Sequence, residues 1–405
     1  MDTEDLLSFD EARSRILGDV PKLGTERVPL AEAVGRVLAE DLVAREPLPR
    51  FDNSAMDGYA VASGDLSADG PYELEVAGES SAGTTPGWLA KGAACRIYTG
   101  APLPERADAV VMQEHVTREG DVLRFTTRPK PGQHVRRAGE DLAAEAVAIP
   151  SWTRMTPGGL ALAAMLGRPE LVVSRRPVVT IVCTGDELRR PGEPLDPASI
   201  PESNSAPLGA LARQAGAVVR VAPIARDDPR ATLKAIEGAL VGTDVLLTVG
   251  GVSVGDRDHV RPALQQAGVT LDFWRVAIKP GKPLAFGRSA RTSVLGLPGN
   301  PGSAIVTFVL FGMPLLRAMQ RDSRPSPMLL RARLAVARKR SPDRLELVRS
   351  LLQLEGGQLT ARMHGNQSSG AATSLAASDG LAFVPAGEGA IEPGAWIDFL
   401  RWSDA

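Results

Sequence analysis

Three glycine-rich turns within residues 245–303 constrain what this chain can fold into more than any other feature of its sequence. The first turn, residues 250–258, follows the apolar run 245–249. The second reads Lys-Pro-Gly-Lys-Pro at 279–283, and the third occupies 297–303 after another short apolar run. Ligands of open α/β sheets bind beyond the carboxyl ends of the strands, and glycines there let backbone N–H groups approach an anion. The pattern therefore predicts a phosphate or oxyanion site.

The side chains in these turns indicate which ions such a site would hold. Ser253, Asp256 and Asp258 lie in the first turn, and Lys279 and Lys282 lie in the second. Carboxylates suit a hard cation such as Mg²⁺, whereas paired ammonium groups suit an oxyanion. Lysine supplies only seven of the 46 basic residues, so two lysines three positions apart are hard to attribute to chance. The alternative interpretation is a solvated turn with incidental lysines.

The surrounding residues 176–325 alternate between apolar, strand-like runs and helical segments. This alternation predicts a three-layer α/β domain with a mostly parallel sheet. Carboxylates follow three of the predicted strands; they are Asp186, Glu187, Asp227, Asp228, Asp256 and Asp258. Turns favour aspartate, so one such cluster alone means little. Clusters after three strands of one sheet favour a shared site.

The rest of the chain is predicted to form further domains. Residues 1–45 and 140–175 read as an N-terminal extended and helical domain, and residues 46–139 read as an inserted β domain. Residues 326–405 show short alternating runs that predict a small C-terminal β-barrel, with a sandwich as the alternative. The predicted fold class is therefore multidomain, α/β plus β.

Local helix signals accompany this division. Ser8 and Glu11 form a capping-box pattern, and a second helix is expected over 30–42. A threonine and a proline open an alanine- and leucine-rich segment at 156–166, which is expected to form a buried helix. The Ser-Asn-Ser sequence at 203–205 is expected to cap another helix.

Composition argues against several classes of protein. A formal net charge of −2 over 405 residues does not suit a nucleic-acid binder. Cys95 and Cys183 lie inside apolar runs, which suits the buried thiols of a reduced cytoplasmic protein. The four histidines lack zinc-site spacing. The N-terminus is acidic and no charge-free apolar run has membrane-spanning length, so neither a signal peptide nor a membrane segment is expected.

Seven motifs occur in an order that identifies a family. They are 51–59 (FDNSAMDGY), 98–101 (YTGA) with Pro104, 139–141 (GED), 184–188 (TGDEL), 250–258 (GGVSVGDRD), 277–283 (AIKPGKP) and 297–301 (LPGNP). Together they closely resemble the molybdopterin molybdenumtransferase, or MoeA, family, which includes the gephyrin E domain. The resemblance covers nearly the whole chain, and the ordered set is far more specific than any single motif.

This resemblance implies a reaction. Adenylylated molybdopterin and molybdate would be converted to molybdenum cofactor, with release of AMP and dependence on Mg²⁺. Lys279 and Lys282 would hold molybdate, a tetrahedral dianion, near the pterin dithiolene. The glycine turns, a cation and its carboxylates would hold the substrate pyrophosphate. Lysine and Mg²⁺ would also stabilise the charge that develops as AMP leaves.

By motif position, the resemblance assigns roles to individual residues. The catalytic set comprises Asp57, Thr99, Asp141, Glu187, Asp227, Ser253, Asp258, Lys279 and Lys282. The substrate-binding set comprises Gly250, Gly251, Ser253, Gly255, Arg275, Lys279, Lys282, Pro283, Pro298, Pro301, Ser303, Arg349 and Ser369. The metal set comprises Glu187, Asp227 and Asp258. Arg344 could replace Arg349, Ser368 could replace Ser369, and Arg275 stands where relatives often carry lysine. A purely structural role is the alternative for Thr99, for Glu187 and for residues 298–301, which would start the following helix.

The resemblance also implies a cytoplasmic homodimer in which each active site is shared between chains. Asp57, Thr99 and Asp141 of one chain would complete the α/β site of the other. Molybdopterin adenylyltransferase and molybdoenzyme-loading proteins are further candidate partners, and no nucleic acid or membrane is expected. Two alternative functions stay open: a gephyrin-like scaffold, and molybdopterin adenylyltransferase itself. The latter usually lacks the Val-Ser-Val insertion and the two flanking modules that this chain has. The choice between molybdenum and tungsten is also open.

Overall fold

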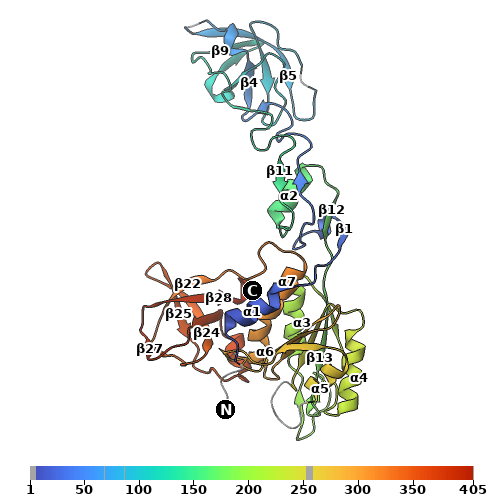
Figure 1. Ribbon diagram of the computed structural model, residues 1–405. Coiled ribbons are helices and arrows are strands. Elements are labelled where there is room, and N and C mark those ends of the chain that lie inside the picture. The colour runs from blue at the N-terminus through green and yellow to red at the C-terminus, as the bar shows by residue number, and fades with distance from the viewer. Residues whose placement is uncertain (1–5, 68, 86, 252–258, 405) are drawn as a thin grey trace. The chain divides into compact units, whose positions relative to one another are not determined.

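The computed structural model describes residues 6–67, 69–85, 87–251 and 259–404 of the 405-residue chain. The chain divides into two compact units (Figure 1). The first comprises Met1–Ala39, Trp152–Thr156 and Glu170–Ala405, and the second comprises Glu40–Ser151 and Pro157–Pro169. The α/β sheet and the C-terminal barrel both belong to the first unit, and the finer domain boundaries expected from the sequence stay predictions.

A six-stranded sheet forms the centre of the first unit. Its strand order is β16 (Val218–Val221), β13 (Val178–Cys183), β17 (Val245–Val249), β21 (Ser293–Leu297), β20 (Ala285–Arg288) and β18 (Thr270–Phe273). The first four strands are parallel neighbours, and the last two pair antiparallel. The predicted mostly parallel sheet is therefore confirmed. The carboxyl ends of its parallel strands meet at one edge.

Helices cover both faces of this sheet, because successive residues of a strand point to opposite faces. Ile181 packs with α1 (Phe9–Gly18), α3 (Ser205–Gln214) and the helical run 301–319. Val182, the next residue, packs instead with α4 (Pro229–Leu240) and α5 (Val260–Gln266). Figure 1 shows α3 and α4 on opposite sides of β13. The predicted three-layer α/β architecture is confirmed.

One helical run in the described chain is long and apolar enough to cross a membrane by length and composition alone. It joins α6 (Pro301–Thr307), a π-helical turn (Phe308–Gly312) and α7 (Met313–Met319), and its mean hydropathy is 1.6. However, 89% of its apolar window is buried inside the protein. A helix that is apolar on all sides and buried on all sides is the core helix of a large domain.

The C-terminal residues form a closed β-barrel. Strand β24 (Leu345–Glu355) pairs with β25 (Gln358–Met363) and with β26 (Gly380–Val384). Strand β28 (Trp396–Arg401) pairs with β26 and with β22 (Leu330–Leu334), which pairs with β25 and closes the ring. The predicted barrel is confirmed. Strand β19 (Ile278–Lys279) joins β24 in parallel and carries the start of the lysine turn.

The second unit contains the inserted β domain. Its sheet has the order β7 (Ala109–Met112), β4 (Gly58–Val61), β6 (Ala93–Ile97), β5 (Tyr72–Ser80), β9 (Val122–Phe125) and β8 (Thr117–Glu119). The end of the 51–59 motif enters β4, between β7 and β6. Its residues are thereby held by two neighbouring strands.

Short elements complete the described chain. The two-stranded ladders are β1 (Thr25–Pro29) with β12 (Glu170–Ser174), β2 (Leu42–Val43) with β11 (Val147–Ile149), β3 (Asn53–Ser54) with β10 (Val135–Arg136), β14 (Leu188–Arg189) with β15 (Ile200–Pro201), and β23 (Arg338–Lys339) with β27 (Ala390–Ile391). The remaining α-helices are α2 (Pro157–Met165) and α8 (Ala372–Ala376).

The helix predicted over 30–42 is wrong. Only Leu30–Glu32 forms a short 3₁₀ turn. Gly35 then adopts a φ of +72°, which a right-handed helix cannot accommodate. Leu38 forms a bridge with Val173, a residue far away in the sequence. Tertiary pairing has overridden the local helical pattern here.

The burial predicted for the helix at 156–166 is also wrong. Helix α2 begins at the expected proline, but its buried residue is Ala163, and Met165 is 62% exposed. Apolar composition predicts burial only where another element covers the helix. Within the described residues, most of the surface of α2 is left uncovered.

The capping box predicted for Ser8 and Glu11 is present at the start of helix α1 and can be tested. The Ser8 hydroxyl accepts from the Glu11 N–H at 3.2 Å, and the Glu11 carboxylate accepts from the Ser8 N–H at 2.9 Å. Ser8→Ala is expected to lower the free energy of unfolding by about 1 kcal/mol. Because the two caps are reciprocal, the Ser8→Ala, Glu11→Ala double variant should lose less than the sum of the single losses. Urea denaturation of the four proteins measures this, and additive losses would contradict reciprocal capping.

Candidate functional site

A cavity of about 540 Å³ opens at the carboxyl ends of β13, β17 and β21. The predicted site residues that line it are Glu187, Asp227, Gly250, Gly251, Pro283, Pro298 and Pro301. Each of the three glycine-rich turns contributes at least one of them. The parallel sheet therefore brings together three turns that are separated in the sequence, as expected for a ligand site beyond strand ends.

Two carboxylates, those of Glu187 and Asp227, line this cavity. A side chain at Gly185 would come within 2.5 Å of the Glu187 carboxylate, so glycine leaves the space that this carboxylate occupies. The turn that carries Asp227 is tied to the same place, because its N–H donates to the Asp186 carboxylate at 3.3 Å. The Asp186 N–H donates in return to the Asp227 carboxylate at 3.4 Å. The two strand-end turns are thus linked through reciprocal hydrogen bonds.

The donor set fits a magnesium ion better than a metal that needs many protein ligands. The described ranges hold no cluster of three or more histidine, cysteine, aspartate or glutamate side chains arranged to bind a metal. Mg²⁺ is usually held by one or two carboxylates together with water and substrate phosphate. Glu187 and Asp227 meet that need at the cavity. Asp258, the third predicted ligand, lies outside the described residues, as do Ser253 and Gly255.

Lys279 is anchored to the barrel. Its ammonium donates to the Glu346 carboxylate at 2.9 Å, and the Arg338 guanidinium donates to the other oxygen of the same carboxylate at 2.8 Å. Glu346 is only 4% exposed. Burial raises the pKa of Glu346, but the hydrogen bonds from Lys279 and Arg338 outweigh it, so its pKa lies below the ordinary value. Glu346 is therefore a charged, buried anchor for the lysine turn.

Lys282 has a different environment from Lys279. Its side chain is exposed, and it makes no hydrogen bond or ion pair with any residue that the structure describes. Its carbonyl oxygen accepts from the N–H groups of Val276 and Leu284, which fixes the backbone. A side chain at Gly281, whose φ is +110°, would collide with Thr307 of α6 at 2.4 Å. The turn is therefore fixed, and the Lys282 ammonium is left available for a ligand.

Arg349 and Ser369 lie together beside the start of α6. Arg349 is 1% exposed, and its guanidinium donates to the Ser368 carbonyl at 2.9 Å. The Gly302 N–H donates to the Ser369 carbonyl at 3.0 Å, and the Asn300 amide donates to the Ser369 hydroxyl at 3.1 Å. Burial lowers the pKa of Arg349.

The other serine and arginine candidates are placed as follows. Ser303 lies inside α6 and is 4% exposed. Arg344 lies 3.6 Å from its neighbour Asp343. Of the two alternative arginines, Arg349 is thus the one that contacts the segment containing Ser368 and Ser369.

Cys183 lines the cavity but does not have the properties of a nucleophile. Burial raises the pKa of its thiol, and the nearby Glu202 carboxylate raises it further. The thiol stays protonated, and only thiolates are reactive nucleophiles.

Asn204 is a cavity residue that the sequence reading assigned only to a helix cap. Its side chain does not cap α3; instead the Glu202 carboxylate accepts from the N–H groups of Asn204 and Ser205, at 2.6 and 2.9 Å. The Asn204 amide donates to the Gly299 carbonyl at 2.9 Å and so ties α3 to the third glycine-rich turn. The signal that could have pointed to Asn204 as a cavity residue is its position directly before a helix that packs against the sheet.

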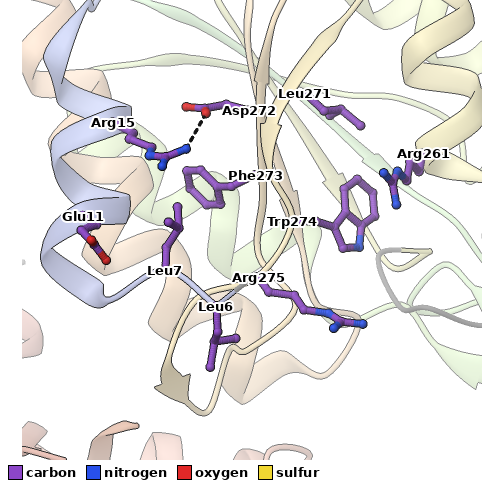
Figure 2. A pocket seen from close by; sticks show the side chains of 10 residues that line it. All are labelled: Leu6, Leu7, Glu11, Arg15, Arg261, Leu271, Asp272, Phe273, Trp274 and Arg275. Carbon is purple, nitrogen blue, oxygen red and sulfur yellow. Dashed lines mark hydrogen bonds and ion pairs between the residues drawn. The ribbon is translucent and has the colours of Figure 1, made fainter. Parts of the chain in front are cut away.

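Arg275 lines a second cavity, of about 610 Å³ (Figure 2). The guanidinium of Arg261 lies over the Trp274 ring there, 5.4 Å from its centroid, and Arg15 pairs with Asp272 at 3.0 Å. Figure 2 shows the Arg275 side chain directed away from the Arg15–Asp272 pair. Arg275 is not among the residues that line the strand-end cavity.

In the second unit, Asp57 and Thr99 form a hydrogen-bonded pair. The Thr99 N–H and hydroxyl both donate to one Asp57 oxygen, at 2.7 and 2.8 Å. The pKa of Asp57 lies below its ordinary value. The hydrogen bond from the Thr99 N–H lowers it most, followed by the bond from the Thr99 hydroxyl, and the charge of Arg96 contributes less. The other Asp57 oxygen accepts no hydrogen bond from the described residues. Asp141 is exposed and takes no part in this pair.

These features define the class of protein. Glycine turns, two carboxylates and a lysine turn that meet at the strand ends of a three-layer α/β domain are typical of a site for a phosphorylated ligand and a hard cation.

Comparisons with known proteins narrow this class to a family. Three family models match the chain: the MoeA N-terminal region (domains I and II) at 7–167, a probable molybdopterin binding domain at 180–318, and the MoeA C-terminal region (domain IV) at 331–402. A molybdopterin molybdenumtransferase of Haemophilus influenzae is 38% identical over 90% of this chain and 91% of its own length. One of Nostoc sp. is 37% identical over 96% and 92%.

A solved structure agrees with these sequence matches. The molybdopterin biosynthesis moeA protein from Pyrococcus horikoshii OT3 has a TM-score of 0.84 and 30% identity, covering 98% of this chain and 100% of that one. The chain belongs to the molybdopterin molybdenumtransferase, or MoeA, family.

The two lysines should differ in their effect on stability. Lys279→Ala removes one of the two cations from the buried Glu346 carboxylate. We expect a loss of about 1–2 kcal/mol in the free energy of unfolding, moderated because the lysine is half-exposed and Arg338 stays. Lys282→Ala, the matched control, should leave stability within about 0.5 kcal/mol of wild type. Urea denaturation of both variants distinguishes them, and equal losses would contradict the anchoring role of Lys279.

The Asp57–Thr99 pair predicts a pH dependence. Because the pKa of Asp57 is lowered on folding, its contribution to stability is present above about pH 4 and is lost as pH falls through the lowered value. Thr99→Val removes the hydroxyl donor and should raise that pKa towards the ordinary value. The stability gap between wild type and Thr99→Val should therefore close at acidic pH, measured by urea denaturation across a pH series. In an Asp57→Asn background the gap should not change with pH; a gap with the same pH dependence there would contradict the pairing.

Proposed function

We propose that this protein inserts molybdate into adenylylated molybdopterin, forming molybdenum cofactor and releasing AMP in a Mg²⁺-dependent reaction. The observation that carries the proposal is the strand-end cavity where all three glycine-rich turns meet. Its carboxylates suit the cation and its glycine turns suit a phosphorylated substrate. The matching relatives carry the name molybdopterin molybdenumtransferase, which supports this chemistry. Tungstate as an alternative substrate is tested in the same assay.

In this proposal the carboxylates hold the metal. Glu187, Asp227 and Asp258 would bind Mg²⁺ against the substrate phosphates. When bound, the ion would neutralise negative charge on the phosphate as AMP leaves. Gly250 and Gly251 let the backbone come close to the phosphate, since each has a positive φ and no side chain.

The lysine turn and its neighbours would hold the oxyanion. Lys282 is exposed, and no described residue binds its ammonium group, so it is the first candidate to bind molybdate. Lys279 would contribute charge from a fixed position, because Glu346 already holds it. Arg349 and Ser369 would support the same region through the loop that contacts α6.

We further propose a cytoplasmic homodimer in which two chains share each active site. The predicted site residues fall in two separate units: Asp57, Thr99 and Asp141 in one, and Glu187 to Ser369 in the other. A twofold dimer would create two equivalent clefts. The two free cysteines are both buried, which suits a reducing compartment. Molybdopterin adenylyltransferase and molybdoenzyme-loading proteins are the expected further partners.

The direct test is incubation with adenylylated molybdopterin, Mg²⁺ and molybdate or tungstate, following AMP release. Lys282→Ala should raise the molybdate concentration needed for half-maximal release by roughly tenfold or more, since a charge-assisted contact contributes about 1.5–3 kcal/mol. Lys91→Ala, an exposed lysine of the second unit, is the matched control and should behave as wild type. No AMP release by the wild-type protein would sink the proposed function, and binding of a receptor-like partner without activity would favour a scaffold.

Mixed dimers test the shared site. Asp57→Ala and Lys282→Ala chains should each be poorly active as homodimers. In a mixed dimer one cleft would carry both lesions and the other neither, so activity near half of wild type per dimer is expected. Two tags and tandem purification isolate the mixed species. If it is as inactive as its parents, the two sets of residues act within one chain, or Asp57 is structural.

A further inference from the structure

An arginine in the second unit contacts two tyrosine rings. The Arg96 guanidinium is 5.1 Å from the ring centroid of Tyr59 and 4.8 Å from that of Tyr98. The same guanidinium donates to the Gly58 carbonyl at 3.1 Å and to the Gln113 side chain at 2.8 Å. Two cation–π contacts and two hydrogen bonds fix its position and its plane.

The two rings of this stack differ in exposure. Tyr59 is 6% exposed and belongs to the core of the β domain, where it packs with Val61 and Tyr72. Tyr98 is 36% exposed. The buried ring therefore anchors the guanidinium, and the guanidinium supports one face of the ring that is open to solvent. An exposed tyrosine side chain normally keeps rotational freedom; this one is held in place before any ligand arrives.

The stack lies beside a predicted catalytic pair. Tyr98 directly precedes Thr99, whose N–H and hydroxyl hold the Asp57 carboxylate. Gly58, whose carbonyl binds Arg96, directly follows Asp57. The two chain segments that carry the catalytic pair are thus joined a second time through Arg96. A ligand of the Asp57 carboxylate would therefore bind near the chain segment that carries Tyr98.

We propose that Tyr98, supported by Arg96, is a stacking surface for a planar heterocycle of the substrate. This inference rests on the proposed function, because adenylylated molybdopterin carries two such rings, the pterin and the adenine. A flat aromatic face that is rigid and partly exposed binds heterocycles by stacking and needs no specific hydrogen bonds to them. Arg96 acts as a positioning residue: it does not contact the substrate, but it sets the orientation of the ring and of the Asp57–Thr99 pair.

The second unit also provides a matched control. Trp88 is 67% exposed, and the guanidinium of Arg106 lies 5.8 Å from its ring centroid. Arg106 is paired with Asp65 and is not connected to any predicted site residue. Trp88 thus shares the exposed ring and the arginine support with Tyr98 but lacks the neighbouring catalytic pair.

The experiment compares Tyr98→Leu, Tyr98→Phe and Trp88→Leu in the full-length protein. Tyr98→Leu should raise the KM for adenylylated molybdopterin roughly tenfold, the usual effect of losing one stacked base, with a smaller change in kcat. Tyr98→Phe keeps the ring and should stay within about twofold of wild type. Trp88→Leu should leave both constants unchanged. Thermal unfolding of each variant shows whether Tyr98→Leu is folded.

Direct binding then separates the two heterocycles. Titration with AMP alone, followed by calorimetry, and with molybdopterin alone, followed by pterin fluorescence, shows which ligand loses affinity in Tyr98→Leu. A loss for either ligand, with Tyr98→Phe retaining it, supports the stacking role. Wild-type affinity for both ligands and an unchanged KM in folded Tyr98→Leu would overturn it. Absence of AMP release in wild type would refute the proposed function instead, and the binding titrations would still decide the role of Tyr98.

Discussion

A buried carboxylate, Glu346, holds the lysine turn of this protein against the C-terminal barrel. Lys279 and Arg338 bind its two oxygens, and strand β19 pairs with β24 at the same place. A buried carboxylate is costly unless it is paired and hydrogen-bonded, and here each oxygen has a cation. The turn that places Pro283 at the strand-end cavity therefore depends on a residue of the barrel. The barrel is in this sense part of the site, although no predicted metal ligand lies in it.

This anchoring separates the roles of the two lysines. An ammonium group that already pairs with a carboxylate adds positive charge to a site. It binds an anionic ligand less strongly than an unpaired ammonium group does. Lys282 is three residues away and keeps its ammonium exposed, while proline and a positive-φ glycine keep the backbone between them in one conformation. The carboxylates of Glu187 and Asp227 line the same cavity as Pro283, which directly follows Lys282. Under the proposed function, anion and cation binding would fall to different turns at one edge of the sheet.

Much of this arrangement could be predicted from the sequence because its signals are local. The apolar runs before glycine turns, the alternating strands and the Ser8–Glu11 capping box each depend on a few neighbouring residues. What could not be predicted depends on partners that are distant in the chain. Lys279 and Glu346 are 67 positions apart, and nothing near Lys279 indicates its partner. The same holds for the conformation at Gly35 and Leu38 and for the exposure of α2. It also holds for the contacts of Arg96 with Tyr59 and Tyr98. Each depends on which distant residues pack there. The predicted residues Ser253, Gly255 and Asp258 lie outside the described residues, so their roles stay predictions.

Under the proposed function, the strand-end cavity, and not the larger cavity beside Trp274, receives the adenylate part of the substrate. Hydrogen–deuterium exchange of the full-length protein, with and without AMP and Mg²⁺, tests this claim directly. The account predicts slower exchange in peptides that contain residues 184–188 and 298–301, and no change in peptides that contain residues 271–275. Protection confined to 271–275, with the strand-end turns unaffected, would contradict it.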